Sequence, residues 1–162
     1  MAVKTIKKLG DPVLRKTSEK VEKIDRGILE LVKDMKDTVN SDEYTAVGLA
    51  AVQIGVLKRV VVVKLEKTEV FINPEITILD NSQEEMHEGC LSLYSIGCML
   101  KRPKKVHVTA QNLKGKQISF DAEGMLARIF LHEVDHLNGK LFIDYLDSES
   151  KRELMLKISE KS

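Results

Sequence analysis

The sequence has almost no net charge, few cysteines and no long hydrophobic run. Its 26 lysines and arginines nearly balance 25 aspartates and glutamates, which leaves no bulk electrostatic case for binding DNA or an anionic membrane. No apolar run approaches the roughly 20 residues that a membrane-spanning helix needs, and residues 1–4 lack the apolar core of a signal peptide. The two cysteines, eight residues apart, suit a reducing compartment better than a disulfide framework. We therefore expect a cytoplasmic protein.

Internal repeats and linker-like segments are also lacking. A chain of 162 residues is long enough to bury about two-thirds of its unfolded surface in a single core. We therefore expect residues 1–162 to form one domain.

The chain does contain a motif with strong chemical meaning, HEVDH at residues 132–136. Apolar residues in the flanking run have the spacing of a core-facing helix: Met125, Leu126, Ile129, Phe130 and Val134. Two histidines four apart on a helix differ by about 40° of rotation and about 6 Å of rise, so His132 and His136 can reach one metal ion. Glu133 can then accept a proton from a water molecule activated by that ion, the base role that HExxH has in metallohydrolases.

A catalytic site of this kind needs a third protein ligand and one open position. The metzincin pattern HExxHxxGxxH would place its last histidine at Phe142, which excludes that class. A thermolysin-like glutamate, Glu149 or Glu153, is disfavoured because only 26 residues follow His136 and they must supply the whole supporting element. Cys90 follows a glycine that permits close backbone approach, and its thiolate is a soft ligand. Spacing alone leaves open whether Cys90 is that ligand or a small buried hydrophobic residue.

Three motifs together resemble the peptide deformylase family, and they stand in the family's order. They are GLAAVQIG at residues 48–55, EGCLS at residues 88–92 and HEVDHL at residues 132–137. Residues 9–15, 71–76 and 139–144 also look like deformylase segments, so the resemblance covers most of the chain.

This resemblance implies an enzyme of N-terminal processing, which hydrolyses the N-formyl group from the initiator methionine of newly made polypeptides and releases formate. The implied partners are N-formyl-Met nascent polypeptides, and a transient contact with the ribosome would be compatible with such substrates. The implied metal ligands are Cys90, His132 and His136. The family implies Fe²⁺ as the physiological ion, with Zn²⁺, Ni²⁺ or Co²⁺ occupying the site in some preparations.

The resemblance also implies roles for residues around the metal. On sequence alone Gln53 could equally be a solvated side chain, but the family makes it an oxyanion donor, together with the backbone N–H of Leu91. Glu133 is implied as the general base. The apolar pocket for the methionine side chain is expected, from resemblance and helix phase, to be lined by Val47, Gly48, Met125 and Ile129.

The chain departs from the family pattern at several positions near the expected site. Ala46 replaces a glycine, which predicts a slightly narrower approach to the pocket. Residues 94–98 replace the usual Pro-Gly, which changes the loop bordering the substrate, and Arg128 stands where several relatives are apolar. We expect Cys98 to be buried or idle rather than a ligand. The two histidines outside the motif, His87 and His107, are expected to be structural or solvated.

The fold expected is α+β, with antiparallel β-sheets surrounding a central helix that carries HExxH. A scaffold helix of about 15 residues should begin after an Asp25 cap, and a C-terminal helix after a Ser148 cap, with Leu154, Met155 and Ile158 inward. Residues 1–24 should form an extended arm. Strands are predicted at residues 59–65, at 70–72 and 76–79 on either side of Asn73-Pro74, and at 106–110 and 118–120 around a turn at 112–115.

Two other classes of protein stay open. A structural zinc module would use Cys90, Cys98, His132 and His136, but the spacing of the two cysteines does not fit zinc-finger patterns, and Glu133 would have no role. A metallopeptidase that cuts internal peptide bonds would be recognised by cleavage of an unformylated peptide.

Overall fold

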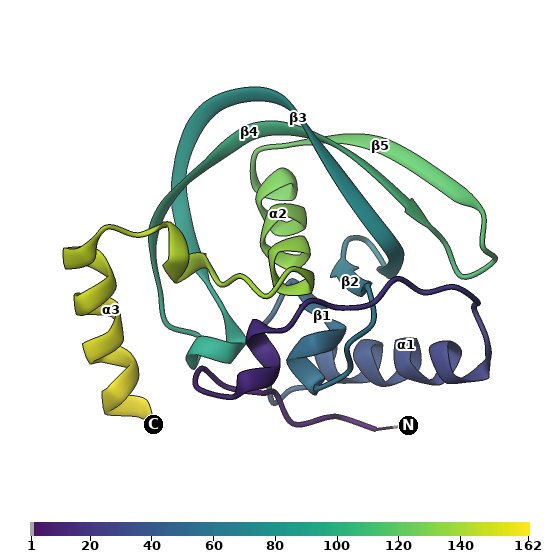
Figure 1. Cartoon of the computed structure of the whole chain (residues 1–162), viewed down its shortest axis with the longest axis horizontal. Helices are drawn as coiled ribbons and strands as arrows, with labels where there is room; N and C mark the ends of the chain where they lie inside the picture. Colours follow the sequence, from purple (N-terminus) through teal and green to yellow (C-terminus); the bar gives the residue numbers. More distant parts are fainter. Residues whose placement is uncertain (1) are drawn as a thin grey trace.

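The computed structural model of the protein describes residues 2–162, and its centre is helix α2, which carries HEVDH (Figure 1). Within the described residues the strands form one antiparallel sheet in the order β1-β2-β3-β4-β5, which curves around α2. The elements are α1 (Arg26–Val39), β1 (Gly48–Ala50), β2 (Val60–Lys64), β3 (Thr68–Gly89), β4 (Gly97–Gln111), β5 (Gln117–Glu123), α2 (Met125–Leu137) and α3 (Ser148–Lys161). Short 3-10 helices are η1 (Pro12–Arg15), η2 (Ala51–Ile54), η3 (Leu91–Leu93) and η4 (Phe142–Tyr145). The expected α+β class is confirmed.

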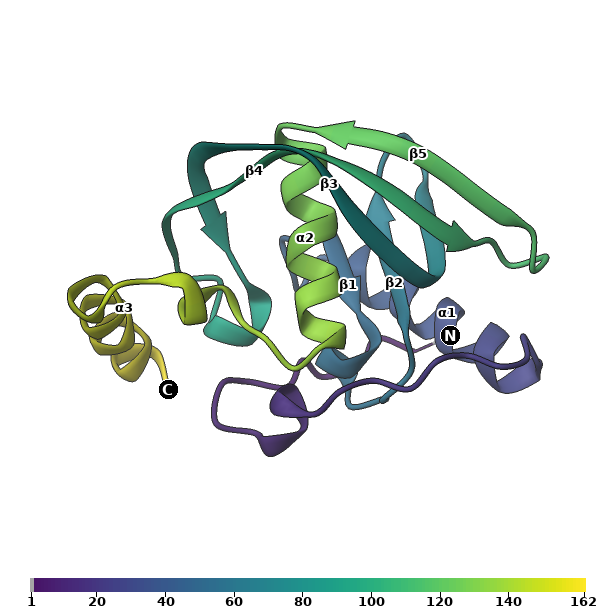
Figure 2. The ribbon, with the colours of Figure 1, turned by 45° about the horizontal axis from the view of Figure 1, so that its top comes forward.

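Helix α1 is the predicted scaffold helix. The Asp25 carboxylate accepts a hydrogen bond from the Ile28 backbone N–H at 3.0 Å, which satisfies one of the free donors at the helix start. The face predicted to be inward is buried and joins the core beneath β2: Ile28, Leu31, Val32, Met35 and Val39. This side of the sheet is covered by α1 and the opposite side by α2 (Figure 2).

Strand β3 is longer than the sequence predicted. The break expected at Asn73-Pro74 was wrong, because β3 continues through it from Thr68 to Gly89. Asn73 takes a left-handed conformation with φ of 52°, and the pairing with β4 shifts between Ile72 and Glu75, so the chain bulges there without ending the strand. The Asn73 side chain also holds the N-terminal arm against the sheet. Its Oδ1 accepts a hydrogen bond from the Val21 N–H at 2.8 Å, and its Nδ2 donates one to the Val21 carbonyl at 2.9 Å.

An aromatic cluster packs helix α2 against the inner face of the sheet. The Phe130 ring meets the Phe71 ring edge-on, with centroids 4.9 Å apart, and the Phe120 ring at 5.3 Å. Phe130, Ala127 and Leu137 are fully buried. These contacts fix the rotation of the helix about its axis, and with it the direction in which the two histidines point.

Gly139 follows the C-cap of α2, Asn138, and replacing it with alanine should destabilise the fold. Its φ is +73°, and an added Cβ would lie 2.6 Å from the Arg15 carbonyl oxygen. Gly115 is a matched control, because its φ is +78° but the nearest atom to an added Cβ is an Ile24 methyl at 3.9 Å. We expect Gly115→Ala to lose about 1–2 kcal/mol of unfolding free energy from the left-handed backbone alone. Gly139→Ala should lose clearly more in urea unfolding; equal losses would show that Arg15 moves aside freely.

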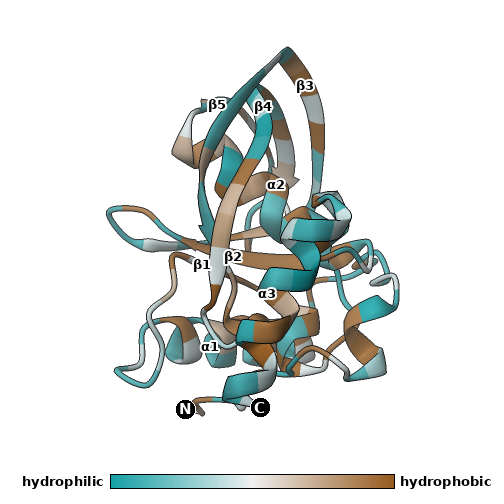
Figure 3. Ribbon diagram, turned by 90° about the vertical axis from the view of Figure 1, so that its left-hand side faces the viewer, coloured by the Kyte–Doolittle hydropathy of each residue, from teal (hydrophilic) through white to brown (hydrophobic). Residues whose placement is uncertain are grey.

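The C-terminal helix differs in detail from its prediction. Its cap is Asp147, whose carboxylate accepts from the Ser150 N–H at 2.8 Å, so the Ser148 cap was wrong by one residue. Leu154 and Ile158 are buried as predicted, but Met155 is 40% exposed because it lies about 100° around the helix from Leu154. Figure 3, which faces α3, shows hydrophilic and hydrophobic residues alternating along it. Among residues 2–162, each helix falls short of the length and apolarity needed to cross a membrane.

Candidate metal centre and active-site cleft

Three potential metal ligands lie together where the C-terminal end of β3 meets the C-terminal half of α2. Cys90 directly follows β3, while His132 and His136 lie on successive turns of α2. The Cys90 Sγ lies 3.4 Å from the His136 Nε2, which lies 3.2 Å from the His132 Nε2. All three ligand atoms are within 4.8 Å of one another. Cys98 is outside this group, half-buried on β4 with a free thiol, which disfavours the four-ligand zinc module.

The Glu88 carboxylate orients one of these histidines. Its Oε2 lies 2.6 Å from the His132 Nδ1, and the Arg102 guanidinium donates to both carboxylate oxygens at 3.1 and 2.7 Å. Although burial acts to raise the pKa of Glu88, the hydrogen bonds from His132 and Arg102 outweigh it and hold the pKa at about 2. An ionised carboxylate can only accept, so His132 Nδ1 carries the proton and Nε2 keeps a lone pair for a metal.

Arg102 is in turn held by a second carboxylate. Its NH1 donates to the Asp135 Oδ2 at 2.7 Å, and the Tyr145 hydroxyl donates to the same oxygen at 3.0 Å. The roles of Glu88, Arg102 and Asp135 were missed from the sequence. Glu88 could have been recognised from its place in the EGCLS motif, two residues before Cys90. Arg102 could not, because its contact with Glu88 follows from the register in which β3 pairs with β4.

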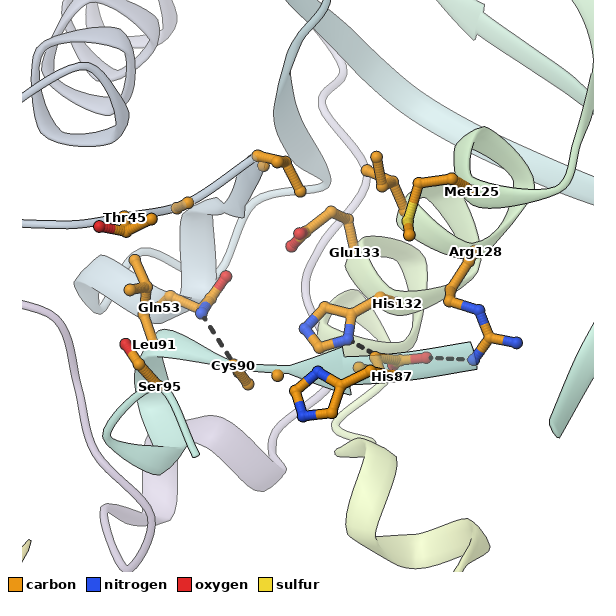
Figure 4. Close-up of a pocket in the computed structure, with 16 residues that line it drawn as sticks. Thr45, Gln53, His87, Cys90, Leu91, Ser95, Met125, Arg128, His132 and Glu133 are labelled. Carbon is orange, nitrogen blue, oxygen red and sulfur yellow. Dashed lines mark hydrogen bonds and ion pairs between the residues drawn. The ribbon is translucent and has the colours of Figure 1, made fainter. Parts of the chain in front are cut away.

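Glu133 is buried beside the ligand group without being one of its members. Its side chain extends from α2 toward the side of the cleft where Gln53 lies (Figure 4). Its Oε1 is buried and finds no hydrogen-bond partner within residues 2–162. Burial raises the pKa of Glu133 to about 7, with the nearby His132 opposing the shift. Gly48 makes the room for this carboxylate, because a Cβ there would lie 2.9 Å from the Glu133 Oε2. The arrangement suits a group that takes up and releases a proton near neutral pH.

Gln53 is fixed with its NH₂ group toward the cysteine. It is only 2% exposed, so the solvated alternative was wrong. Its Oε1 accepts from the Ala50 N–H at 3.0 Å, and its Nε2 donates to the Ser92 Oγ at 3.2 Å and approaches the Cys90 Sγ at 3.8 Å. Leu91 starts η3, where a backbone N–H has no partner within the helix. Both expected oxyanion donors therefore lie beside Cys90.

A cleft of about 450 Å³ opens onto this group. All four residues expected to form the substrate pocket line it: Val47, Gly48, Met125 and Ile129. Val47 and Met125 are 56% and 52% exposed, so they lie at the mouth of the cleft. Of the altered segment 94–98, Ser95 lines the cleft, whereas Tyr94 turns away and packs under the Lys8 ammonium.

The remaining lining residues include Thr45, Ala46, His87 and Arg128. His87 is exposed at the edge of the cleft, and His107 lies elsewhere, with its Nδ1 2.7 Å from Asp121 on β5. The site is therefore a mostly apolar cleft, with a buried thiol and imidazole group and an unpaired carboxylate at its base.

Two buried histidines on an HExxH helix lie beside a cysteine that follows β3. With an apolar cleft and a glutamate that finds no hydrogen-bond partner among residues 2–162, they define the metallohydrolase class of site. A family profile described as polypeptide deformylase matches residues 3–152. The chain belongs to the polypeptide deformylase family, whose named members are enzymes.

Individual relatives agree over nearly the full length. The peptide deformylase of Clostridium botulinum is 48% identical over 145 residues, which cover 89% of this chain and 97% of that protein. Among solved structures, a peptide deformylase from Legionella pneumophila is 37% identical with a TM-score of 0.91, covering 98% of this chain and 95% of that one. The peptide deformylase from Ehrlichia chaffeensis in complex with actinonin is 34% identical, also with a TM-score of 0.91, covering 100% of this chain and 99% of that one.

Proposed function

We propose that this protein hydrolyses the N-formyl group from the N-terminal formylmethionine of newly made polypeptides and releases formate, and that its 162 residues act as one catalytic domain. The observation that carries the proposal is the unpartnered Glu133 carboxylate beside the Cys90, His132 and His136 group. Such substrates arise at the ribosome, so we place the reaction in the cytoplasm, with at most a transient ribosome contact.

The donor set fits one divalent metal ion. A thiolate and two imidazoles suit iron, zinc, nickel and cobalt, and the fixed Nδ1–H of His132 leaves its Nε2 free for coordination. Cys90, His132 and His136 would hold the ion, and a bound ion supplies Lewis-acid activation of water and of the formyl oxygen. We propose Fe²⁺ as the physiological ion. Elemental analysis of protein purified without oxygen tests this, and zinc, nickel or cobalt as the dominant metal would reject it.

The protein's own groups then move the protons. Glu133 takes a proton from the attacking water as the water oxygen bonds to the formyl carbon, and it returns that proton to the nitrogen as the carbon–nitrogen bond breaks. The products are formate and a free amine. The Gln53 amide and the Leu91 N–H donate to the oxygen that gains charge, a contribution typically of about 10²- to 10³-fold in rate per donor.

Specificity should follow from the cleft. The formyl carbon would lie near Gly48, Leu91 and Cys90, which line the cleft. Gly48 already lies close to the Glu133 carboxylate, so we expect little room there for an acetyl methyl. The methionine side chain would rest against Val47, Met125 and Ile129. An aspartate there would place a carboxylate among apolar side chains and in the same cleft as the Glu88 carboxylate, which is unfavourable.

Formate release from N-formyl-Met-Ala-Ser, compared with N-acetyl-Met-Ala-Ser and N-formyl-Asp-Ala-Ser, tests the substrate. We expect rapid release from the first peptide, no detectable deacetylation of the second and very slow turnover of the third. Fast turnover of the aspartyl peptide, or none of the methionyl peptide by metal-loaded enzyme, would refute the assigned substrate.

The competing class, a peptidase that cuts internal bonds, is separated with an unformylated peptide. Incubation with Met-Ala-Ser should leave it intact, because we expect the narrow space between Gly48 and Glu133 to exclude a peptide carbonyl that carries a side chain on its carbon. New amines from Met-Ala-Ser, measured by mass spectrometry, would favour the peptidase.

A further inference from the structure

The turn that follows Cys90 has a strained backbone. It is closed by two hydrogen bonds, from the Tyr94 N–H to the Leu91 carbonyl at 3.1 Å and from the Ser95 N–H to the Cys90 carbonyl at 2.9 Å. Tyr94 and Ser95 both take left-handed conformations, with φ of 57° and 61°. Residues with a Cβ disfavour this conformation, so two of them in a row persist only where contacts from elsewhere hold the turn.

The N-terminal arm supplies such contacts, and Lys8 makes two of them. Its ammonium donates to the Leu91 carbonyl at 3.1 Å and lies over the Tyr94 ring, 5.2 Å from the ring centroid. Lys8 is half-buried, and the backbone N–H of the next residue, Leu9, donates to the Ser92 carbonyl at 2.8 Å. The Lys8 side chain therefore ties the first residue of η3 to the residue that caps its end.

The same arm binds the segment that carries Gln53. The Lys7 N–H donates to the Gln53 carbonyl at 2.7 Å, and the Gln53 side chain donates to the Ser92 Oγ at 3.2 Å. Both Gln53 and Leu91 line the cleft (Figure 4). Residues 7–9 thus connect the two segments from which the proposed oxyanion donors come.

We propose that Lys8 is a positioning residue of the oxyanion hole, which holds the Leu91 N–H in a fixed place relative to the Gln53 amide. The proposal rests on the proposed deformylase function, since only then do these two groups share a substrate oxygen. The N–H and the carbonyl of Leu91 flank the same Cα, so a carbonyl that moves shifts the N–H as well. Because hydrogen bonds weaken steeply as their angle is lost, a small rotation lowers what the donor contributes.

Lys8→Met tests this role, because methionine keeps much of the side-chain length without the ammonium. We expect kcat for N-formyl-Met-Ala-Ser, per metal bound, to fall about tenfold, less than the loss of a whole oxyanion donor, which is about 10²- to 10³-fold. KM should stay within about twofold, because the donor acts mainly on charge that develops in the transition state. An unchanged kcat, or a raised KM alone, would overturn the proposal.

Lys8→Arg is the conservative variant. Its guanidinium can donate to the Leu91 carbonyl and stack on the Tyr94 ring, so kcat should stay within about twofold of wild type. The matched control is Lys4→Met, which removes an exposed lysine of the same arm whose ammonium lies 3.8 Å from Asp34. It should leave kcat and KM unchanged, and a loss equal to that of Lys8→Met would assign the effect to the charge of the arm instead.

A thioformyl substrate separates an effect on the oxyanion from a general loss of activity. Sulfur is a weak hydrogen-bond acceptor, so N-thioformyl-Met-Ala-Ser gains less from the oxyanion donors. The ratio of kcat for the oxygen peptide to kcat for the sulfur peptide does not depend on how much of a sample is folded or metal-loaded. This ratio should fall in Lys8→Met, and an equal loss for both peptides would contradict the proposed role.

Amide hydrogen exchange tests the contact without turnover. In Lys8→Met the amides of Tyr94 and Ser95 should exchange faster than in wild type, whereas those of β2, which pairs with β1 and β3, should be unchanged and so report an intact fold. Unchanged exchange at Tyr94 and Ser95 would overturn the role of Lys8 while leaving deformylation intact. Conversely, if metal-loaded wild-type protein hydrolyses no formyl peptide, the proposed function fails, and exchange alone decides whether Lys8 holds the turn.

Discussion

Glu133→Gln is expected to lower formate release by about 10²- to 10⁴-fold, the usual contribution of a positioned general base. Glutamine has nearly the same shape as glutamate but cannot take a proton from water. The metal content should stay at the wild-type level, because Glu133 lies beside the Cys-His-His group and is not a member of it. Steady-state kinetics with N-formyl-Met-Ala-Ser and elemental analysis of the same samples measure both quantities.

Glu153→Gln is the matched control for this experiment. Glu153 is exposed on α3 and was the alternative downstream ligand in the thermolysin-like arrangement. Its substitution should leave the rate and the metal content unchanged. A Glu133→Gln enzyme that keeps more than a few per cent of wild-type turnover would remove Glu133 from the role of base.

Cys90→Ala should lose the metal and, with it, nearly all formate release. The Cys90 Sγ is one of three ligand atoms, and the other two both come from α2, so its removal leaves two imidazoles on one side of the ion. Two ligands fall short of the three that catalytic sites of this class use. Metal content after dialysis and residual activity should therefore fall together.

Cys98→Ala distinguishes this loss from a general effect of removing a thiol. Cys98 is half-buried on β4 and outside the ligand group, so the variant should keep the metal and the activity. If purified Cys90→Ala still held one equivalent tightly, another side chain would be the third ligand and the proposed coordination would fail.

The sequence predicted the parts of the site that depend on local pattern. The spacing of His132 and His136 within an apolar run specifies a helix and a shared face, and that helix spans Met125–Leu137 in the structure. The Asp25 cap and the inward face of α1 were also predicted correctly, because both depend only on residues that are close together in the sequence. What the pattern of residues 70–79 could not show is that Asn73 adopts a positive φ and lets β3 continue.

The ion-pair network of Glu88, Arg102 and Arg128 could not be predicted from the sequence, because it depends on which residues of β3 and β4 lie opposite each other. Arg102 meets Glu88 only because β3 and β4 pair with Glu84 opposite Arg102 and Glu88 opposite Cys98. Arg128 joins them from a third element, 40 residues along the chain from Glu88. Three charged residues distant in sequence carry no shared periodicity, so nothing in composition or spacing connects them.

The shared acceptor at Glu88 has a thermodynamic consequence. Because one carboxylate accepts from Arg102, Arg128 and His132, changes at these positions are coupled rather than independent. Residues in one such network commonly show interaction energies of about 0.5–3 kcal/mol in double-mutant cycles. Removing Glu88 takes one acceptor from each of two buried guanidinium groups. The loss of unfolding free energy should therefore be smaller when Arg128 has already been replaced. Whether a substitution at Glu88, Arg102 or Arg128 is tolerated will therefore depend on which of the other two has already been replaced.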